Sequence, residues 1–319
     1  MRPGDEVLLP AFTFIAVPSA VVHAGATPVL VEMTGDLAID PDDLERKISD
    51  RTSALLLSYM RGHVPDLERV LGVCADRDIV VIEDVAHGMG VQWDGVPLGR
   101  FGRASAFSFQ SYKLMDGGEG GMLVTDDREV ALRALLQAGC YDRNWRLHFL
   151  PEGDLAWLEA AVNSFPAFGL RMSNLTASAL RPQMARIDDR VTNHRDRYLR
   201  VVAELADCPI RLPAHSDRVR PAPDSLQFEV PTLAPAQLER FVAHCNAQGV
   251  PLQVFGLDPA NSRCFWNWRF SEFGDCPRTR DLLSRLADVP LPLWLDDRSL
   301  SHFVDVIRTG LIEAGAAEG

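Results

Sequence analysis

Short apolar segments alternate with amphipathic segments through the first half of the chain. The apolar segments, several of them rich in Val, Ile, Leu or Phe and bounded by Gly, Asp or Pro, predict β-strands. They are Glu6–Pro10, Pro28–Met33, Ala54–Tyr59, Ile79–Glu83, Ala104–Phe109 and Met122–Thr125. The stretches between them predict helices at Ala16–Ala24, Pro41–Ile48, Pro65–Asp76 and Arg128–Ala138. This alternation predicts an α/β fold with a mostly parallel sheet and flanking helices.

The second half of the chain has a different pattern. From Arg171 to about Leu205 it predicts one long helix, charged on one face, that bridges two parts of the protein. The stretch Pro213–Asp224, rich in Pro, Asp and Arg, predicts a loop. After it we expect a strand at Ser225–Val230, a helix at Pro235–Gln248, a strand at Pro251–Phe255 and a closing helix at Ser299–Ala314. We therefore expect a large domain at 1–200 and a smaller C-terminal α+β domain at 201–319.

Composition narrows the class of protein. The chain has 319 residues, of which 47% are hydrophobic, so it can bury a sizeable core. Its net charge of −12 argues against nucleic acid or an anionic membrane as the main partner. No apolar run is long enough to span a bilayer, and the first residues do not resemble a signal peptide.

The cysteines point to a reducing compartment. The six of them form no CxxC pair and no metal-ligand spacing: Cys74, Cys140, Cys208, Cys245, Cys264 and Cys276. We therefore expect reduced thiols in a cytoplasmic protein, several of them in the core, and no metal site.

Lysine is rare in this chain. Only Lys47 and Lys113 are lysines among the 32 basic residues, and the rest are arginines. A lysine can persist where the chemistry needs an amine that loses its proton, because arginine stays charged. For Lys47, in the polar helix Pro41–Ile48, chance is the simpler explanation.

Polar side chains follow two of the predicted strands. Asp84 comes directly after Ile79–Glu83, and His87 lies three residues further on. Ser108 lies at the end of Ala104–Phe109, and Lys113 follows it, ahead of a glycine-rich loop at 117–121. Because ligands gather at the carboxyl ends of parallel strands, we expect these side chains to lie in a binding site.

This set of groups matches the requirements of pyridoxal phosphate (PLP). A lysine amine forms an imine with the cofactor, a carboxylate pairs with the ring nitrogen, and hydroxyl and amide groups hold the phosphate. Each residue also has a purely structural interpretation. Asp84 could cap the end of a strand, His87 could be a buried core histidine, Ser108 could stabilise a turn, and Lys113 could be exposed to solvent.

Several segments of the chain resemble, in their order and approximate spacing, the DegT/DnrJ/EryC1/StrS family of PLP-dependent aminotransferases, which have fold type I. The segments that carry the resemblance are Pro3–Val7, Pro10–Phe14, Gly25–Val29, Arg61–His63 with Asp66, Ile82–His87, Ser108–Gly121, and Arg171–Asn174 continuing through Gln183. They extend over most of the chain.

The resemblance implies a role for each candidate residue. Lys113 would be the catalytic Schiff-base lysine and proton shuttle, and Asp84 would pair with the ring nitrogen. His87 would lie near the phenolic oxygen of the ring, Phe14 would stack on the ring, and Ser108 would hydrogen-bond the phosphate. Phe14 could equally be an ordinary core aromatic.

The resemblance also implies an activity. A family member would move an amino group from glutamate or glutamine to a keto sugar, a cyclitol or a similar keto acceptor, in a homodimer whose sites span the subunit interface.

Two departures from the family pattern keep a second hypothesis open. Family members carry several dozen residues ahead of the segment Pro3–Val7, including a phosphate-binding turn, which we expect to be missing here. They also have an asparagine two residues before Arg171, where this chain has Gly169. The chain is therefore either an active aminotransferase or a non-catalytic homologue that acts as a partner or regulatory subunit. A related sugar dehydratase is disfavoured, because those enzymes replace the lysine by histidine.

The sequence gives less information about the substrate. Arg263, Trp266, Asn267, Trp268 and Arg269 form a polar-aromatic cluster that could line a carbohydrate site, although we expect it to pack the small domain. The segment Ser58–His63 departs from the form common in nucleotide-sugar enzymes, which suggests an acceptor other than a nucleotide sugar.

Overall fold

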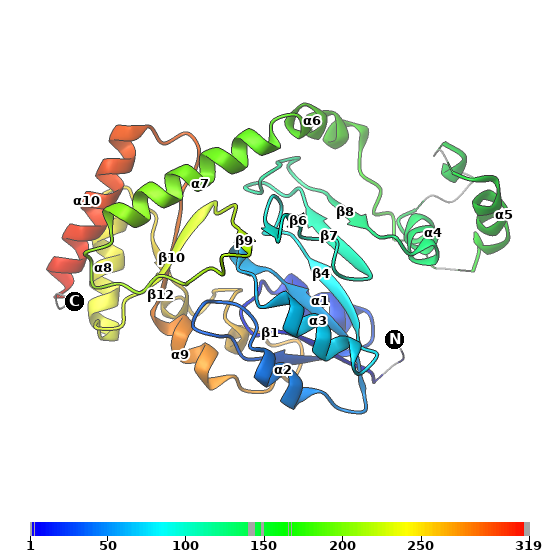
Figure 1. Cartoon of the computed structure of the whole chain (residues 1–319), viewed down its shortest axis with the longest axis horizontal. Coiled ribbons are helices and arrows are strands. Elements are labelled where there is room, and N and C mark those ends of the chain that lie inside the picture. The colour runs from blue at the N-terminus through cyan, green and yellow to red at the C-terminus, as the bar shows by residue number, and fades with distance from the viewer. Residues whose placement is uncertain are drawn as a thin grey trace.

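A six-stranded sheet forms the centre of the first half of the molecule (Figure 1). The computed structural model describes residues 2, 4–139, 144–147, 150–164, 166 and 168–315. The strands lie in the order β2 (Thr27–Val31), β1 (Glu6–Pro10), β3 (Thr52–Ser58), β4 (Val80–Asp84), β7 (Ala104–Ser108) and β8 (Gly121–Val124). All neighbours are parallel except β7 and β8, which pair antiparallel at one edge. The predicted mostly parallel sheet is confirmed.

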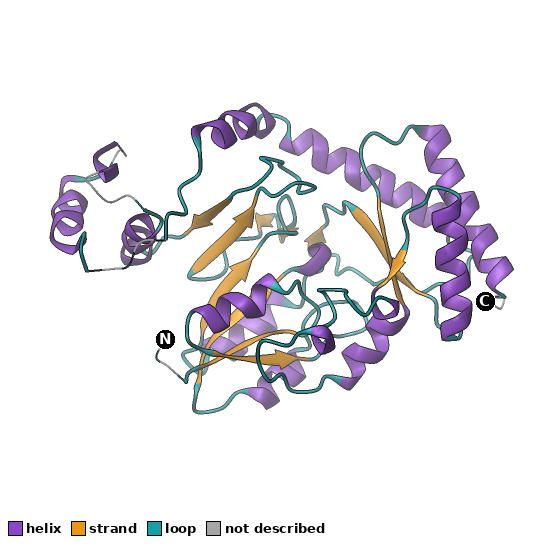
Figure 2. Cartoon of the chain, turned by 180° about the vertical axis from the view of Figure 1, so that it is seen from behind, coloured by secondary structure: helices purple, strands orange, loops and turns teal. Residues whose placement is uncertain are grey.

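Helices cover both faces of this sheet (Figure 2). They are α1 (Ala16–His23) on one face and α2 (Pro41–Lys47) and α3 (Leu67–Ala75) on the other. Val17 of α1 packs in one core with Val7 and Leu9 of β1, whereas Val70 of α3 packs in a second core with Leu8. Because successive side chains of a strand point to opposite faces, these two cores lie on opposite sides of the sheet. The predicted α/β layering is confirmed.

The sequence pattern located the six strands of this sheet and the helices α1, α2 and α3 to within one or two residues at each end. It located α4 (Arg128–Gln137) equally well. It missed several further elements, most of them four residues long or shorter. These are η1 (Met60–Gly62), β5 (Gln92–Trp93), β6 (Val96–Pro97), η2 (Asn144–Leu147) and α5 (Glu152–Ala161). The predicted loop Pro213–Asp224 contains β9 (Val219–Arg220), which completes a small antiparallel sheet with β5 and β6.

The single long helix predicted from Arg171 to Leu205 is wrong in one respect. The segment forms two helices, α6 (Asn174–Met184) and α7 (Ile187–Glu204). Pro182, in the last turn of α6, has no N–H for the carbonyl four residues earlier, and the chain leaves helical geometry at Arg186 (φ −116°, ψ 7°). The sequence has a helical pattern on both sides of Arg186, so the pattern alone does not indicate that the helix is interrupted there.

A second, antiparallel sheet organises the C-terminal part. It contains β10 (Ser225–Glu229), β12 (Leu286–Pro290) and β11 (Gln253–Val254), in that order. The helices α8 (Pro235–Ala247) and α10 (Asp297–Ala314) share one hydrophobic core with this sheet and with α7. Neither β12 nor the preceding α9 (Pro277–Arg285) was predicted. No helix in the described ranges is long and apolar enough to cross a membrane.

Between β11 and α9 the chain returns to the first half of the molecule. This segment contains η3 (Phe255–Leu257) and η4 (Phe265–Asn267). Phe265 and Trp268 pack in the core that contains Val7 and Leu9 of β1. The expectation that the cluster around Trp268 packs the small domain is therefore wrong, because its aromatic rings cover the large sheet instead. The division into domains at residue 200 stays a prediction.

A buried carboxylate fixes the end of β4. The Glu83 side chain is fully buried and accepts a hydrogen bond from the Tyr59 hydroxyl at 2.8 Å. It also accepts three backbone N–H groups from the turn at 99–102, at 2.7–2.9 Å. Burial, with the negative charge of Glu83 beside it, raises the pKa of Tyr59 well above its usual value. This network anchors the residue immediately before Asp84.

The cysteines within the described residues are free thiols. Four of them are buried, and Cys208 is partly exposed. Burial raises the pKa of Cys74 to about 11 and that of Cys264 to about 12, which leaves these thiols protonated and unreactive. Cys140, Met1 and Pro3, on which part of the sequence interpretation rests, lie outside the described residues.

Candidate active site

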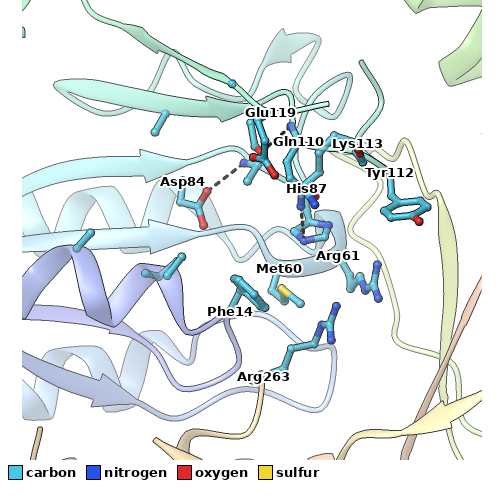
Figure 3. A pocket seen from close by; sticks show the side chains of 18 of the residues that line it. Phe14, Met60, Arg61, Asp84, His87, Gln110, Tyr112, Lys113, Glu119 and Arg263 are labelled. Atoms are coloured by element: carbon cyan, nitrogen blue, oxygen red, sulfur yellow. Dashed lines mark hydrogen bonds between the residues drawn. The ribbon is translucent and has the colours of Figure 1, made fainter. Parts of the chain in front are cut away.

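A cavity of about 680 Å³ opens at the carboxyl ends of the parallel strands (Figure 3). Phe14, Asp84, His87, Ser108 and Lys113 all line it. Asp84 is the last residue of β4 and Ser108 the last of β7, whereas Phe14 lies just beyond β1. The structure therefore brings all five predicted site residues together, and their individual roles stay predictions. The cavity lies within the range of small-molecule sites, about 300–1,000 Å³.

A compact loop between β7 and β8 presents Lys113 to the cavity. The backbone N–H of Phe109 bonds to the Gly120 carbonyl at 2.9 Å, and Gly117 N–H returns to the Phe109 carbonyl at 2.8 Å. Below the loop, Phe109 packs in a small core with Met115 and Leu180. These contacts fix the loop from both sides and orient the lysine inward.

The environment of Lys113 favours the neutral amine. Desolvation lowers the pKa of Lys113 from 10.5 to about 8. Two nearby carboxylates oppose this shift, and the guanidinium groups of Arg61 and Arg263 reinforce it. A lysine with a pKa close to the working pH can exchange a proton readily and can act as a nucleophile.

His87 is the direct partner of Lys113. Its Nε2 atom lies 2.8 Å from Lys113 Nζ. Desolvation and the adjacent positive charge of Lys113 hold the pKa of His87 well below 6.5, so the ring is neutral. When Lys113 is protonated its ammonium group can only donate, so Nε2 accepts and the ring proton lies on Nδ1. This Nδ1 is buried and has no partner among the described residues, which leaves one donor for a bound ligand.

A chain of hydrogen bonds holds Asp84. Ser58 Oγ donates to Asp84 Oδ2 at 2.6 Å and accepts from Thr13 Oγ1 at 2.8 Å. The other carboxylate oxygen accepts the backbone N–H of Ala86 at 3.0 Å. The carboxylate is therefore fixed in orientation while it remains open to the cavity. Ser58 was not identified as a site residue from the sequence.

The remaining predicted residues have looser surroundings. The Phe14 side chain is 42% exposed at the cavity wall, which is unusual for a core aromatic. Ser108 Oγ accepts the backbone N–H of Gln110 at 3.3 Å. Gly169 lies in the left-handed region (φ 68°), with open space around it, and does not line the cavity.

Two arginines also line the cavity: Arg61, which the sequence did not assign to a site, and Arg263, which it offered only as part of a cluster that could line a carbohydrate site. Arg61 comes from η1, where its backbone is left-handed (φ 56°). Its guanidinium forms an ion pair with Asp288 of β12 at 2.5 Å. Arg263 comes from the segment that returns from the second half. Positive charge therefore lines the part of the cavity opposite Asp84, as Figure 3 shows.

Because the chain holds two lysines, the protonation of Lys113 can be measured directly. After reductive methylation with labelled formaldehyde, we expect one lysine NMR resonance of the cofactor-free protein to titrate at about pH 8. The neutral fraction should grow as the pH rises through about 8 rather than through 10.5, because desolvation lowers the folded-state pKa below the unfolded one. The Lys113→Arg variant should lack this resonance, and Lys47→Arg should keep it. A Lys113 resonance that titrates near pH 10.5 would contradict the desolvated environment.

An α/β fold with a lysine, a carboxylate and an aromatic ring around a strand-end cavity is typical of the aminotransferase class. The chain belongs to the DegT/DnrJ/EryC1/StrS aminotransferase family, whose model matches residues 1–308.

Curated relatives match part of their length. GDP-perosamine synthase of Escherichia coli O157:H7 is 34% identical over 194 residues, which are 60% of this chain and 50% of that protein. A putative L-glutamine:3-amino-2,3-dideoxy-scyllo-inosose aminotransferase of Micromonospora echinospora is 38% identical over 136 residues, 42% of this chain and 32% of that protein. The chain therefore spans about half the length, or less, of these relatives.

The fold is that of solved sugar aminotransferases. A putative sugar aminotransferase of Streptococcus pneumoniae, in its PMP form, superposes with a TM-score of 0.82 at 23% identity. The match covers 98% of this chain and 83% of that chain. The same protein has also been solved in a PLP form, which superposes with a TM-score of 0.78. The predicted fold type is confirmed.

Proposed function

We propose that this chain forms the active site of a PLP-dependent aminotransferase. One observation carries the proposal: the Lys113 amine, held 2.8 Å from a neutral His87, shares a cavity with the fixed carboxylate of Asp84. A solvated surface lysine would keep its ordinary pKa, whereas that of Lys113 is lowered to about 8.

The residues of the cavity fit this cofactor. Asp84 would hold the ring nitrogen through its carboxylate, Phe14 would cover a ring face, and Ser108 would donate its hydroxyl to the phosphate. The unpartnered Nδ1–H of His87 offers a donor for a polar atom of the cofactor. When bound, PLP supplies a carbonyl group that captures amines and a ring that accepts the electron pair left by a departing proton.

The chain's own residues contribute the proton chemistry. Neutral Lys113 would take a proton at Nζ from the carbon atom attached to the substrate nitrogen. It would then return this proton to the carbon atom on the opposite side of the same nitrogen. His87 keeps the amine in position through its Nε2 and stays uncharged, so it does not compete for the proton. Arg61 and Arg263 help to lower the pKa of Lys113 to about 8, which increases the neutral fraction of the amine at physiological pH.

For the substrates, we propose glutamate or glutamine as the amino donor and a keto sugar, a cyclitol or a similar keto compound as the acceptor. The names of the relatives support this class, because one is a perosamine synthase and another a glutamine-dependent inosose aminotransferase. They favour the catalytic hypothesis over a non-catalytic partner or regulatory subunit. The reaction would belong to amino-sugar biosynthesis for secondary metabolites or the cell surface.

We further propose that the protein acts as a cytoplasmic homodimer. Large apolar side chains are exposed on β8 and on the segment 168–184: Met122, Leu123, Val124, Phe168, Leu170, Leu175 and Met184. A monomer rarely leaves so many clustered apolar residues uncovered, so a second copy is the natural cover for them. The free thiols support a reducing compartment.

An absorbance titration tests the enzymatic proposal. We expect purified protein mixed with PLP to show a long-wavelength band that L-glutamate or L-glutamine bleaches and that a keto acceptor restores. Size-exclusion chromatography with light scattering on the same sample should give twice the monomer mass. Folded protein that shows no such band with PLP would refute the proposed function.

A further inference from the structure

Arg263 is a cation in the cavity that forms no ion pair with any residue the structure describes. None of its guanidinium N–H groups has a hydrogen-bond or ion-pair partner among the described residues, and its Nε atom is buried. Buried guanidinium groups are normally paired, because leaving their donors unmatched is costly. Arg61, its neighbour, differs in this respect because it forms an ion pair with Asp288.

The backbone around Arg263 is tightly fixed. The backbone N–H of Ile15 donates to the Ser262 carbonyl at 3.0 Å, and Cys264 forms a β-bridge with Phe12. The backbone N–H of Arg263 itself donates to Asn261 Oδ1 at 3.0 Å. These contacts attach the segment to the end of β1, so Arg263 is presented to the cavity from a rigid support.

Aromatic rings define the path of the side chain. The Arg263 guanidinium lies 5.8 Å from the centroids of both Phe14 and Phe255. Such contacts stabilise a cation without using its N–H donors, which lie in the plane of the guanidinium. Packing against the two rings therefore accounts for the position of the Arg263 side chain. It leaves the guanidinium N–H groups free to donate hydrogen bonds to a ligand.

The two ends of the cavity carry opposite charge. Figure 3 shows Asp84 at one end, the guanidinium groups of Arg61 and Arg263 at the other, and His87 and Phe14 between them. Burial and the charge of Arg61 lower the pKa of Arg263. Two cations that repel each other, of which only Arg61 forms an ion pair within the described residues, form a site that an anion would stabilise.

We propose that Arg263, with Arg61 beside it, binds the α-carboxylate of the amino donor. The amino group of the donor must come within reach of Lys113 Nζ, and its α-carboxylate is attached to the same carbon atom. That carboxylate must therefore lie close to Lys113, where the charges of both arginines are felt. A planar carboxylate matches the fork of guanidinium donors. This inference rests on the proposed aminotransferase function.

The donor half-reaction without any keto acceptor isolates this contact. We expect Arg263→Gln to raise the half-saturating concentration of L-glutamate about 10- to 100-fold, the loss typical of a charge-assisted hydrogen bond. The limiting rate should change less, because the contact stabilises the bound donor and the transition state to a similar extent. Arg269→Gln is the matched control, since Arg269 lies in the same segment but bonds to the Trp266 carbonyl and does not line the cavity.

Two further readouts separate carboxylate binding from a structural role. L-2-Hydroxyglutarate keeps the α-carboxylate but cannot donate an amine, and calorimetry on the PLP-loaded protein should show weaker binding to Arg263→Gln than to the parent. L-Isoglutamine, whose α-carboxylate is replaced by an amide, should be a poorer donor than glutamate for the parent. For Arg263→Gln this preference should largely disappear. Arg61 is unsuited to this test, because its removal would leave Asp288 buried and unpaired.

The outcomes distinguish this inference from the proposed function. If PLP gives its long-wavelength band and glutamate bleaches it equally well in parent and Arg263→Gln, the inference is overturned while the function stands. The inference also fails if only steps with a phosphate-bearing keto acceptor are impaired, because Arg263 would then bind the acceptor. Loss of donor affinity and of the preference over isoglutamine together would establish Arg263 as the carboxylate-binding residue.

Discussion

Replacing Lys113 with alanine is expected to lower the rate of amine transfer about 10⁴-fold, the upper range for loss of a proton-transfer group. The long-wavelength absorbance band of PLP with the protein should disappear in the same variant. Alanine offers neither a nucleophile nor a base, and His87, the nearest basic group at 2.8 Å from Lys113 Nζ, cannot replace it. Its pKa lies well below 6.5, so it binds a proton too weakly.

Lys47→Arg is the matched control for this experiment. Lys47 is the other lysine, and it forms an ion pair with Asp43 at 3.1 Å without lining the cavity. The control should keep both the band and the rate. Lys113→Arg should behave like Lys113→Ala, because a guanidinium does not lose its proton. Methylamine added to Lys113→Ala should restore a small part of the rate by entering the vacated space. A folded Lys113→Ala protein with the parent's band would show that another amine captures PLP.

The sequence could predict the residues that strands deliver to the site. Asp84 and Ser108 end parallel strands, and the carboxyl ends of such strands meet at one edge of the sheet. Lys113 follows Ser108 in a loop closed by local backbone hydrogen bonds. In these cases short-range pattern and topology together determine the position, so the sequence is enough to place Asp84, Ser108 and Lys113 at the site.

The sequence could not predict the positive end of the cavity. Arg263 reaches the cavity because Cys264 pairs with Phe12, a contact between residues far apart in the chain that no local pattern encodes. Arg61 depends on a left-handed backbone and on Asp288, which lies in a strand. That same buried aspartate interrupts the apolar pattern of β12, which explains why this strand was missed.

Asp84→Asn is expected to slow amine transfer about 10²- to 10³-fold while the absorbance band of PLP persists. The amide keeps the shape of the carboxylate but lacks the negative charge that would stabilise a protonated ring nitrogen. The fold should tolerate the change. The amide oxygen can keep the bond from the Ala86 N–H, and the amide nitrogen can donate to Ser58, whose hydroxyl accepts as well as donates.

Ser58→Ala separates the charge of Asp84 from its orientation. This control removes the 2.6 Å hydrogen bond to Asp84 Oδ2 but leaves the carboxylate charged. We expect a loss of about tenfold, in line with one hydrogen bond to a charged group. If charge is the decisive property, Asp84→Asn must be slower than Ser58→Ala by at least an order of magnitude in single-turnover assays with L-glutamate. Equal rates in the two variants would mean that Asp84 acts only by fixing the geometry of the cavity, and another group would then have to stabilise the ring nitrogen.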